Sequence, residues 1–306
     1  PGPVGNAVIA GDLAYLTDSH GGLRVLDVST PSSPVEVGFV DLPGWTTGVD
    51  VSGGFAYVGC SDGLHVVDVS TPSDPVAVGF SPTSDVAEDI EVVGNQAYLA
   101  GGLPGGLSVF DVSIPSSPIE LGYIDTDDAM DVAVFGRYAL VASWGNGLRV
   151  IDVSTPQNPT EVAVVWPAGY TSGVAVSGSH AYVSSRGSGG LSVYRITDPE
   201  NPVMAGRFDS PSDAQAVAVE AGVAYVAEYY GGLWAIDVSD PTSPSEIGIE
   251  ESYRAADQID VAGDHLFVTG TQLWGGSGME VFSTSGCSVD LPMPSAPRRG
   301  GGRVTP

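Results

Sequence analysis

Acidic side chains are the most numerous groups in this chain that could do chemistry. Among 306 residues there are 37 Asp and Glu against 10 basic residues, all of them arginine, and the formal net charge is −27. This charge argues against nucleic acid and against insertion at anionic membranes, because both partners attract basic patches. Glu88, Asp89 and Asp131 are the candidate metal ligands, with calcium as the expected ion, since hard cations bind several carboxylate oxygens. Solvated acidic loops without a bound ion are the favoured interpretation, and the calcium site is the alternative.

The segment from Asp125 to Asp131 has the acidic spacing of a calcium loop but is not an EF-hand. Met130 and Gly136 stand where that loop needs its glycine and its bidentate glutamate. Any calcium site here would therefore be of another type.

Histidine and cysteine chemistry finds little support in the sequence. The four histidines are expected in different strands and turns, and the chain has no HExxH, two-Cys two-His or GxSxG motif. Cys60 and Cys287 are expected at opposite faces of the fold, so no disulfide is predicted between them. We predict no catalytic residues, and an enzyme is the less favoured function.

An internal repeat of about 42 residues is the strongest pattern in the sequence. The phrase from Gly22 to Pro34 returns five times, and a degraded copy begins at Gly278. One large residue, usually aromatic, precedes each copy, and these seven anchors are 41 to 43 residues apart. The anchors are Tyr15, Tyr57, Tyr98, Leu140, Tyr182, Tyr225 and Phe267. Such even spacing indicates a repeat architecture.

Each repeat contains four short strand candidates. In the second repeat these are Gly48–Ser52, Phe55–Cys60, Leu64–Ser70 and Val76–Phe80. A two-residue glycine turn joins the first two strands, and a Ser-Thr-Pro-x-x-Pro link joins the last two. The sequence therefore predicts an all-β fold, a seven-bladed β-propeller of four-stranded antiparallel blades. An open solenoid or a six-bladed ring fits the spacing less well.

The seventh blade is expected to be incomplete. Its fourth strand would have to be Cys287–Leu291, which lacks the proline lead-in. We expect side-chain packing to join blades one and seven, and an open strand edge in blade seven would allow self-association. Residues 1–291 are predicted to form the propeller, and residues 292–306 a Pro/Gly/Arg-rich tail or linker.

The phrases Leu23–Ser29 and Leu148–Ser154 resemble LVIVD repeats, and the resemblance extends over about residues 6–284. Arg195 and Ser283 depart from the family's aspartate. The resemblance implies a bacterial or archaeal β-propeller that is exported or attached to the cell surface. It transfers no catalytic motif onto this chain.

The aspartate of the repeated phrase has a structural interpretation. It recurs in nearly every repeat, whereas a catalytic centre needs asymmetry. We predict that it accepts backbone N–H hydrogen bonds beside the proline link. The members are Asp27, Asp68, Asp111, Asp152 and Asp237.

The repeats differ most in the loops that enter the first strand and in those between strands two and three. In the usual blade order these loops share one face, which we call the upper face. Exposed aromatic residues on loops are typical of recognition sites, and the alternative is that these rings only cover the blade tops. The candidate ligand-binding residues are Trp45, Trp144, Trp166, Tyr170, Tyr229, Tyr230 and Trp274.

Three functions are compatible with these features. The leading one is a non-enzymatic extracellular or cell-surface protein that binds protein or glycan through the upper face. The first alternative is a hydrolase or lyase that uses carboxylates and a cation at the tunnel mouth, which requires Glu88, Asp89, Asp131 and Asp257 to converge. The second alternative is a structural subunit of a surface layer or filament.

Overall fold

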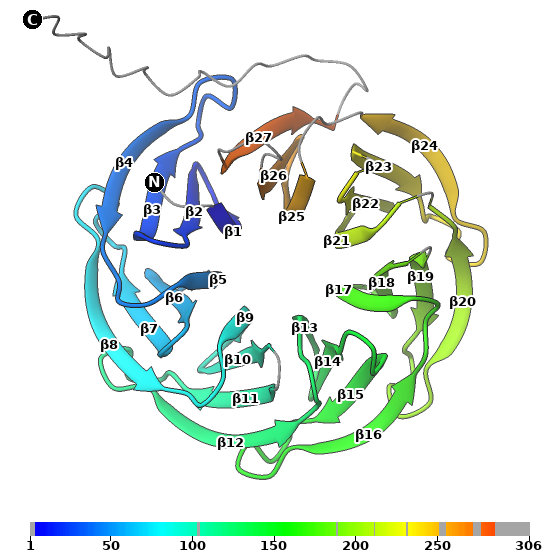
Figure 1. Ribbon diagram of the computed structural model, residues 1–306, viewed down its shortest axis with the longest axis horizontal. Helices are drawn as coiled ribbons and strands as arrows, with labels where there is room; N and C mark the ends of the chain where they lie inside the picture. The colour runs from blue at the N-terminus through cyan, green and yellow to red at the C-terminus, as the bar shows by residue number, and fades with distance from the viewer. Residues whose placement is uncertain are drawn as a thin grey trace, which may run out of the picture.

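Each repeat folds into one antiparallel sheet, because its apolar segments are short and are separated by turn-forming residues. The computed structural model describes residues 4–102, 105–187, 189–210, 212–230, 232–250, 255–271 and 277–284. Within these residues it contains seven sheets and no helix. Figure 1 shows the sheets as seven blades around a central axis. The prediction of an all-β, seven-bladed propeller is confirmed.

Six blades have four strands each, in sequential order from the axis outward. Blades one to three consist of β1 (Val4–Ala10), β2 (Leu13–Asp18), β3 (Gly22–Asp27), β4 (Val35–Val40), β5 (Thr46–Ser52), β6 (Phe55–Cys60), β7 (Gly63–Asp68), β8 (Val76–Pro82), β9 (Ala87–Val93), β10 (Gln96–Gly101), β11 (Gly106–Asp111) and β12 (Ile119–Asp125).

Blades four to six follow the same order. They consist of β13 (Asp131–Phe135), β14 (Tyr138–Ala142), β15 (Leu148–Asp152), β16 (Thr160–Val165), β17 (Tyr170–Ser177), β18 (His180–Arg186), β19 (Gly190–Arg195), β20 (Val203–Phe208), β21 (Ala214–Glu220), β22 (Val223–Glu228), β23 (Gly232–Asp237) and β24 (Ser245–Glu250).

Blade seven has three strands among the described residues. They are β25 (Ala255–Ala262), β26 (His265–Thr271) and β27 (Ser277–Ser283). The expected incomplete last blade is thus confirmed. The candidate fourth strand Cys287–Leu291 and the tail 292–306 lie outside the described residues.

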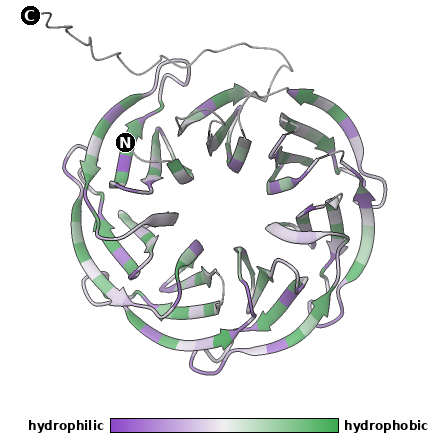
Figure 2. Cartoon of the chain, viewed as in Figure 1, coloured by the Kyte–Doolittle hydropathy of each residue, from purple (hydrophilic) through white to green (hydrophobic). Residues whose placement is uncertain are grey.

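The first strand of every blade lies nearest the axis, as the usual blade order predicts. Each of these strands contacts the first strands of its two neighbours, and β25 contacts β1 to complete the circle. Figure 2 shows that hydrophilic and hydrophobic residues alternate along the outermost strands, which are covered on one side only.

The core consists of seven apolar clusters, one between each pair of neighbouring blades. The repeat anchors and the Leu, Val and Ile residues of the repeated phrase fill these clusters, and all seven anchors are buried. Burial of apolar surface between blades is therefore the main stabilising contribution.

The repeated aspartate stabilises the link to the outer strand, as predicted. The carboxylate of Asp27 accepts hydrogen bonds from the Ser29 backbone N–H at 2.9 Å and from the Ser29 hydroxyl at 2.6 Å. The same backbone bond recurs at 2.9 Å in blades two, three, four and six. A structural role for this position is confirmed.

Blades one and seven are separate sheets among the described residues. Ala7 and Leu16 of blade one pack against Phe267 and Met279 of blade seven. The junction therefore depends on side-chain packing, as the sequence predicts.

Candidate functional site

The two sets of loops that vary most do lie on one face. The backbone N–H of Ser61, between β6 and β7, donates to the carbonyl of Trp45, which precedes β5, at 2.8 Å. In blades four and five, the Thr171 N–H donates to the Trp144 carbonyl at 2.9 Å. These bonds join loops of the two types, so the upper face exists as expected.

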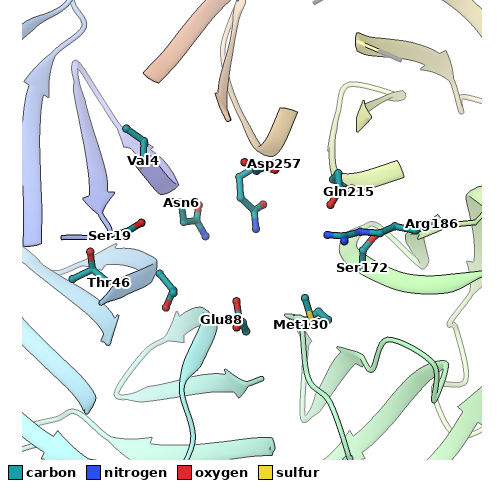
Figure 3. Close-up of a pocket in the computed structure, with 13 residues that line it drawn as sticks. Val4, Asn6, Ser19, Thr46, Glu88, Met130, Ser172, Arg186, Gln215 and Asp257 are labelled. Carbon is teal, nitrogen blue, oxygen red and sulfur yellow. The ribbon is translucent and has the colours of Figure 1, made fainter. Parts of the chain in front are cut away.

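A cavity of about 200 Å³ opens at the centre of the upper face. We call it the axial cavity. All seven blades contribute to it, and Figure 3 shows several polar side chains directed toward its middle. Its lining consists of Val4, Gly5, Asn6, Ser19, Thr46, Thr47, Glu88, Met130, Ser172, Arg186, Gln215, Asp257 and Gln258.

One repeat position supplies a lining residue from every blade. In every blade the anchor pairs with one residue of the first strand, and the lining residue lies three positions before that residue. The seven residues at this position are Gly5, Thr47, Glu88, Met130, Ser172, Gln215 and Asp257. No residue type occurs twice in this ring. The blades thus share the same strand order but differ in the side chains that they place at the axis.

A β-bulge places most of these side chains. In β17, for example, Thr171 and Gly173 pair with Ser185 and Ser184, and Ser172 lies unpaired between them. Comparable irregularities occur at this level in the first strands of all blades except the fourth. A bulge redirects a side chain away from the alternating pattern of a strand. Strict alternation would place this residue between two blades. The bulge turns its side chain into the cavity instead.

Charges of both signs line the axial cavity. Burial raises the pKa of Glu88, and the neighbouring carboxylates of Asp128 and Asp89 raise it further. Burial lowers the pKa of Arg186, while Asp213 and Asp257 act in the opposite direction. The cavity therefore holds one arginine among carboxylates, and acidic groups outnumber it.

An aromatic cluster lies beside Arg186. The guanidinium carbon is 4.7 Å from the centre of the Trp144 ring, and the Trp144 and Tyr170 rings stack with their centres 5.3 Å apart. Trp144 has a φ of 31°, which bulky residues rarely adopt. Backbone strain of this kind concentrates at binding sites.

Other predicted aromatic residues are exposed on the same face. Relative exposure is 63% for Trp45, 66% for Trp166, 50% for Tyr170 and 69% for Tyr230. Trp144 and Tyr229 are half-buried. Trp274 lies outside the described residues. The six described rings are therefore accessible to a partner, and they do not merely fill the core.

The candidate calcium ligands come together only in part. Asp89 and Asp131 share a hydrogen bond, and burial together with the charge of Asp89 raises the pKa of Asp131 well above its usual value. Asp131 also accepts the Val174 N–H of the next blade at 2.7 Å. Glu88 faces the axial cavity, above this pair.

Those three carboxylates do not form a compact ligand set. Among the described residues, one group of three His, Cys, Asp or Glu side chains has all donor atoms within 4.8 Å of one another, and it lies elsewhere, in blade two. Asp257, required by the hydrolase or lyase alternative, belongs to blade seven and lies near Arg186. Asp257 therefore lies apart from the Asp89–Asp131 pair of blades three and four, and the four carboxylates of that alternative do not converge.

Several inner-strand carboxylates connect neighbouring blades. Asp50 accepts the Val51 N–H of its own strand and the Val92 N–H of blade three, both at 2.7 Å. Glu91 accepts the Val134 N–H of blade four at 2.6 Å. These bonds satisfy backbone donors at the inner edge of each sheet, which otherwise has no partner strand.

Sequence reasoning missed Arg186, Ser172 and Thr46 as lining residues. Arg186 ends β18, and Ser172 and Thr46 lie in first strands where alternation predicts core. A sequence signal exists, because aligning the repeats on their anchors shows one position occupied by seven different residue types.

Comparison with protein families identifies the repeats. The LVIVD repeat model matches residues 1–42, 43–83, 86–126, 127–165, 168–210 and 211–251. The chain belongs to the LVIVD-repeat family. Each matched repeat spans one of the first six blades, and the seventh, three-stranded blade lies beyond the matched residues.

Solved structures share the fold of this LVIVD-repeat protein. The β-propeller domain of Myceliophteria thermophila Cps50 (Swd1) is 13% identical, with a TM-score of 0.74, covering 92% of this chain and 96% of that chain. The computationally designed Ika8 protein is 11% identical, with a TM-score of 0.68, covering 92% of this chain and 83% of that chain. Comparison with curated proteins gave no match.

The LVIVD-repeat propeller fold supports a binding or scaffold role in general. None of the described residues forms a helix that is long and apolar enough to span a membrane.

Proposed function

We propose that this protein is a non-enzymatic recognition module that binds a partner through its upper face. The observation that carries the proposal is the position of the axial cavity beside accessible aromatic rings. Trp45 directly precedes the cavity residue Thr46, and Trp144 contacts the cavity residue Arg186. Interface centres are rich in Trp, Tyr and Arg, which give much contact area at low entropic cost.

The charge of the face favours a basic protein segment as the partner. Glu88 and Asp257 line the cavity, and the whole chain carries a net charge of −27. An acidic field attracts a basic partner and raises its association rate. A lysine or arginine side chain could enter the cavity while the aromatic rings pack around its segment.

A glycan is the second candidate partner. The exposed indole rings of Trp45 and Trp166 favour it, because flat apolar rings accept the faces of sugars. Support for an extracellular or cell-surface location comes from the family resemblance alone. Cell fractionation with protease treatment of intact cells tests that part of the proposal.

Binding arrays separate the candidates. We expect the labelled protein to bind basic peptides on a peptide array, with and without calcium, and the variants Trp45→Ala and Tyr170→Ala to lower affinity about tenfold or more. Ile114→Ala is the matched control, because Ile114 is an equally exposed apolar residue on a proline link of the opposite face.

Three results would contradict the proposal in different ways. Binding on a glycan array alone would select the glycan. Equal loss in the Ile114→Ala control would place the interface elsewhere. Sedimentation showing an extended assembly, without binding on either array, would favour the structural-subunit alternative.

A further inference from the structure

Three side chains with metal-binding chemistry meet at the upper rim of blade two. They are Cys60 at the end of β6, Asp62 in the following turn and His65 in β7. Their sulfur, carboxylate oxygen and ring nitrogen donors all lie within 4.8 Å of one another. Asp62 Oδ1 is 2.9 Å from His65 Nε2. The group is separate from the axial cavity and from the inner-strand carboxylates.

The hairpin brings these residues together. Cys60 pairs with Gly63 across the turn, and Val58 pairs with His65, so the side chains of Cys60 and His65 lie on the same face of the sheet. Asp62 occupies the turn between them. A Cys-x-Asp-x-x-His spacing over a tight hairpin is therefore sufficient to form a three-donor group.

Blade two alone carries this combination among the described blades. In blade one the corresponding positions are Asp18 and Arg24, which form an ion pair at 2.7 Å. In blade six they are Glu228 and Trp234. The residue types at these two positions differ from blade to blade, and only blade two fills them with a thiol and an imidazole.

We propose that Cys60, Asp62 and His65 bind one zinc-type divalent metal ion. Zinc accepts sulfur, nitrogen and carboxylate oxygen ligands, and its bond lengths place tetrahedral donors about 3.3–3.8 Å apart. The present separations need only a small adjustment, in which the contact between His65 and Asp62 lengthens as the metal enters. The Cys60 thiol loses its proton to solvent on binding, so the thiolate and the Asp62 carboxylate balance the two charges of the ion.

Exposure of the three residues fits a metal site better than a catalytic cysteine. Cys60 and His65 are buried, whereas the Asp62 side chain is 40% exposed. An ion can enter from the side of Asp62, where water can occupy the fourth position. A nucleophilic cysteine needs access to substrate, and Cys60 has none.

Cobalt is the spectroscopic probe for this site. Titration of the metal-free, reduced protein with Co²⁺ should give a thiolate-to-cobalt charge-transfer band with a stoichiometry of one ion per chain. Zinc should displace the cobalt and abolish the band. Cys287→Ser is the matched control, because it removes the other cysteine of the chain and should leave the band intact.

Variants at the three ligands decide the assignment. Cys60→Ser should abolish the charge-transfer band, and the turn variant Asp62→Asn, which leaves the core untouched, should weaken cobalt binding about tenfold or more. His65→Gln should also weaken it. Unfolding curves confirm that each variant is folded.

Two outcomes would overturn the proposal. One is the absence of a thiolate–cobalt band in the wild-type protein. The other is a band that persists in Cys60→Ser and disappears in Cys287→Ser. Neither outcome affects the proposed upper-face partner, which the peptide and glycan arrays test independently.

Discussion

Carboxylates of this protein occupy two contrasting environments. Asp27 lies exposed beside a proline link, where hydrogen bonds from Ser29 lower its pKa. Asp50 and Glu91 lie on innermost strands, where burial raises the pKa to about 6 and about 7, although backbone N–H donors act in the opposite direction. A carboxylate therefore stabilises a turn where it is exposed and ionised. On the innermost strands it connects two blades, but its burial there disfavours the ionised form.

The raised pKa values predict a stability that increases on mild acidification. A carboxyl whose pKa is higher in the folded than in the unfolded state binds protons on folding, so its penalty is full above pH 7 and relaxes as the pH falls. Lowering the pH from 8 to 5 should raise the free energy of unfolding by about 1–2 kcal/mol for Asp50 and about 2–3 kcal/mol for Glu91. Urea unfolding at several pH values measures this.

The variants Asp50→Asn and Glu91→Gln should flatten the pH dependence of unfolding between pH 5 and 8. Asp27→Asn is the control. The pKa of Asp27 is lowered, so this carboxylate affects the free energy of unfolding only at more acidic pH. A wild-type protein that loses stability steadily from pH 8 to 5 would show that the inner-strand carboxylates are not the controlling groups.

Individual residues were predictable where the repeat defines their surroundings. The role of Asp27 follows from its place before a Ser-Thr-Pro link, and that role is present in the structure. The contact of Arg186 with Trp144 was not predictable, because Trp144 belongs to another blade and nothing within one repeat indicates that contact. The neighbours of His65 lie in its own hairpin, so the Cys-x-Asp-x-x-His spacing was a signal that sequence reasoning missed.

At the scale of the element, the outer strands contain a second type of bulge. Val25 pairs with Gly38 and Leu26 with Glu36, so that one residue of β4 has no partner. The same shift occurs between the third and fourth strands of the other four-stranded blades. Sequence alternation predicted the strands but not these bulges, because an inserted residue interrupts the two-residue period that the prediction uses.

Outer strands also pack closely on the link of the next blade. A methyl group at Gly79 in β8 would collide with the carbonyl of Pro115. Gly79→Ala should therefore lower the free energy of unfolding by about 1–3 kcal/mol through overpacking. Chemical denaturation measures the change.

Ala77→Ser, at an exposed position of the same strand, is the control and should change stability by less than about 0.5 kcal/mol. Equal stability of both variants would show that the link moves aside.

At the scale of the whole molecule, the junction of blades one and seven differs from a shared sheet. Besides apolar packing, the Ile9 N–H donates to Asp260 at 2.8 Å, and the Thr269 hydroxyl donates to the Gly5 carbonyl at 2.7 Å. This kind of junction was predictable from sequence, because the seventh repeat lacks the proline lead-in to a fourth strand. The hydrogen bonds across the junction were not, since they connect residues more than 250 positions apart.

Hydrogen exchange should reveal this junction. Amide protons of blades one and seven are expected to exchange faster than those of blades three to five, because local opening needs fewer broken interactions there. Asp260→Ala should accelerate exchange in blades one and seven specifically. Asp50→Ala, which removes the equivalent bond between blades two and three, is the matched control. Uniform protection around the ring would contradict the expectation.

The junction also determines how the molecule bears tension. Because each blade is a continuous stretch of chain, a pull on residues 4 and 284 loads the contact between blades one and seven before it loads any strand pair. That contact separates face to face, whereas strands within a blade would have to slide along their hydrogen bonds. The ring should therefore open at this junction at low force, while every blade stays folded, and it should close again when the force is released.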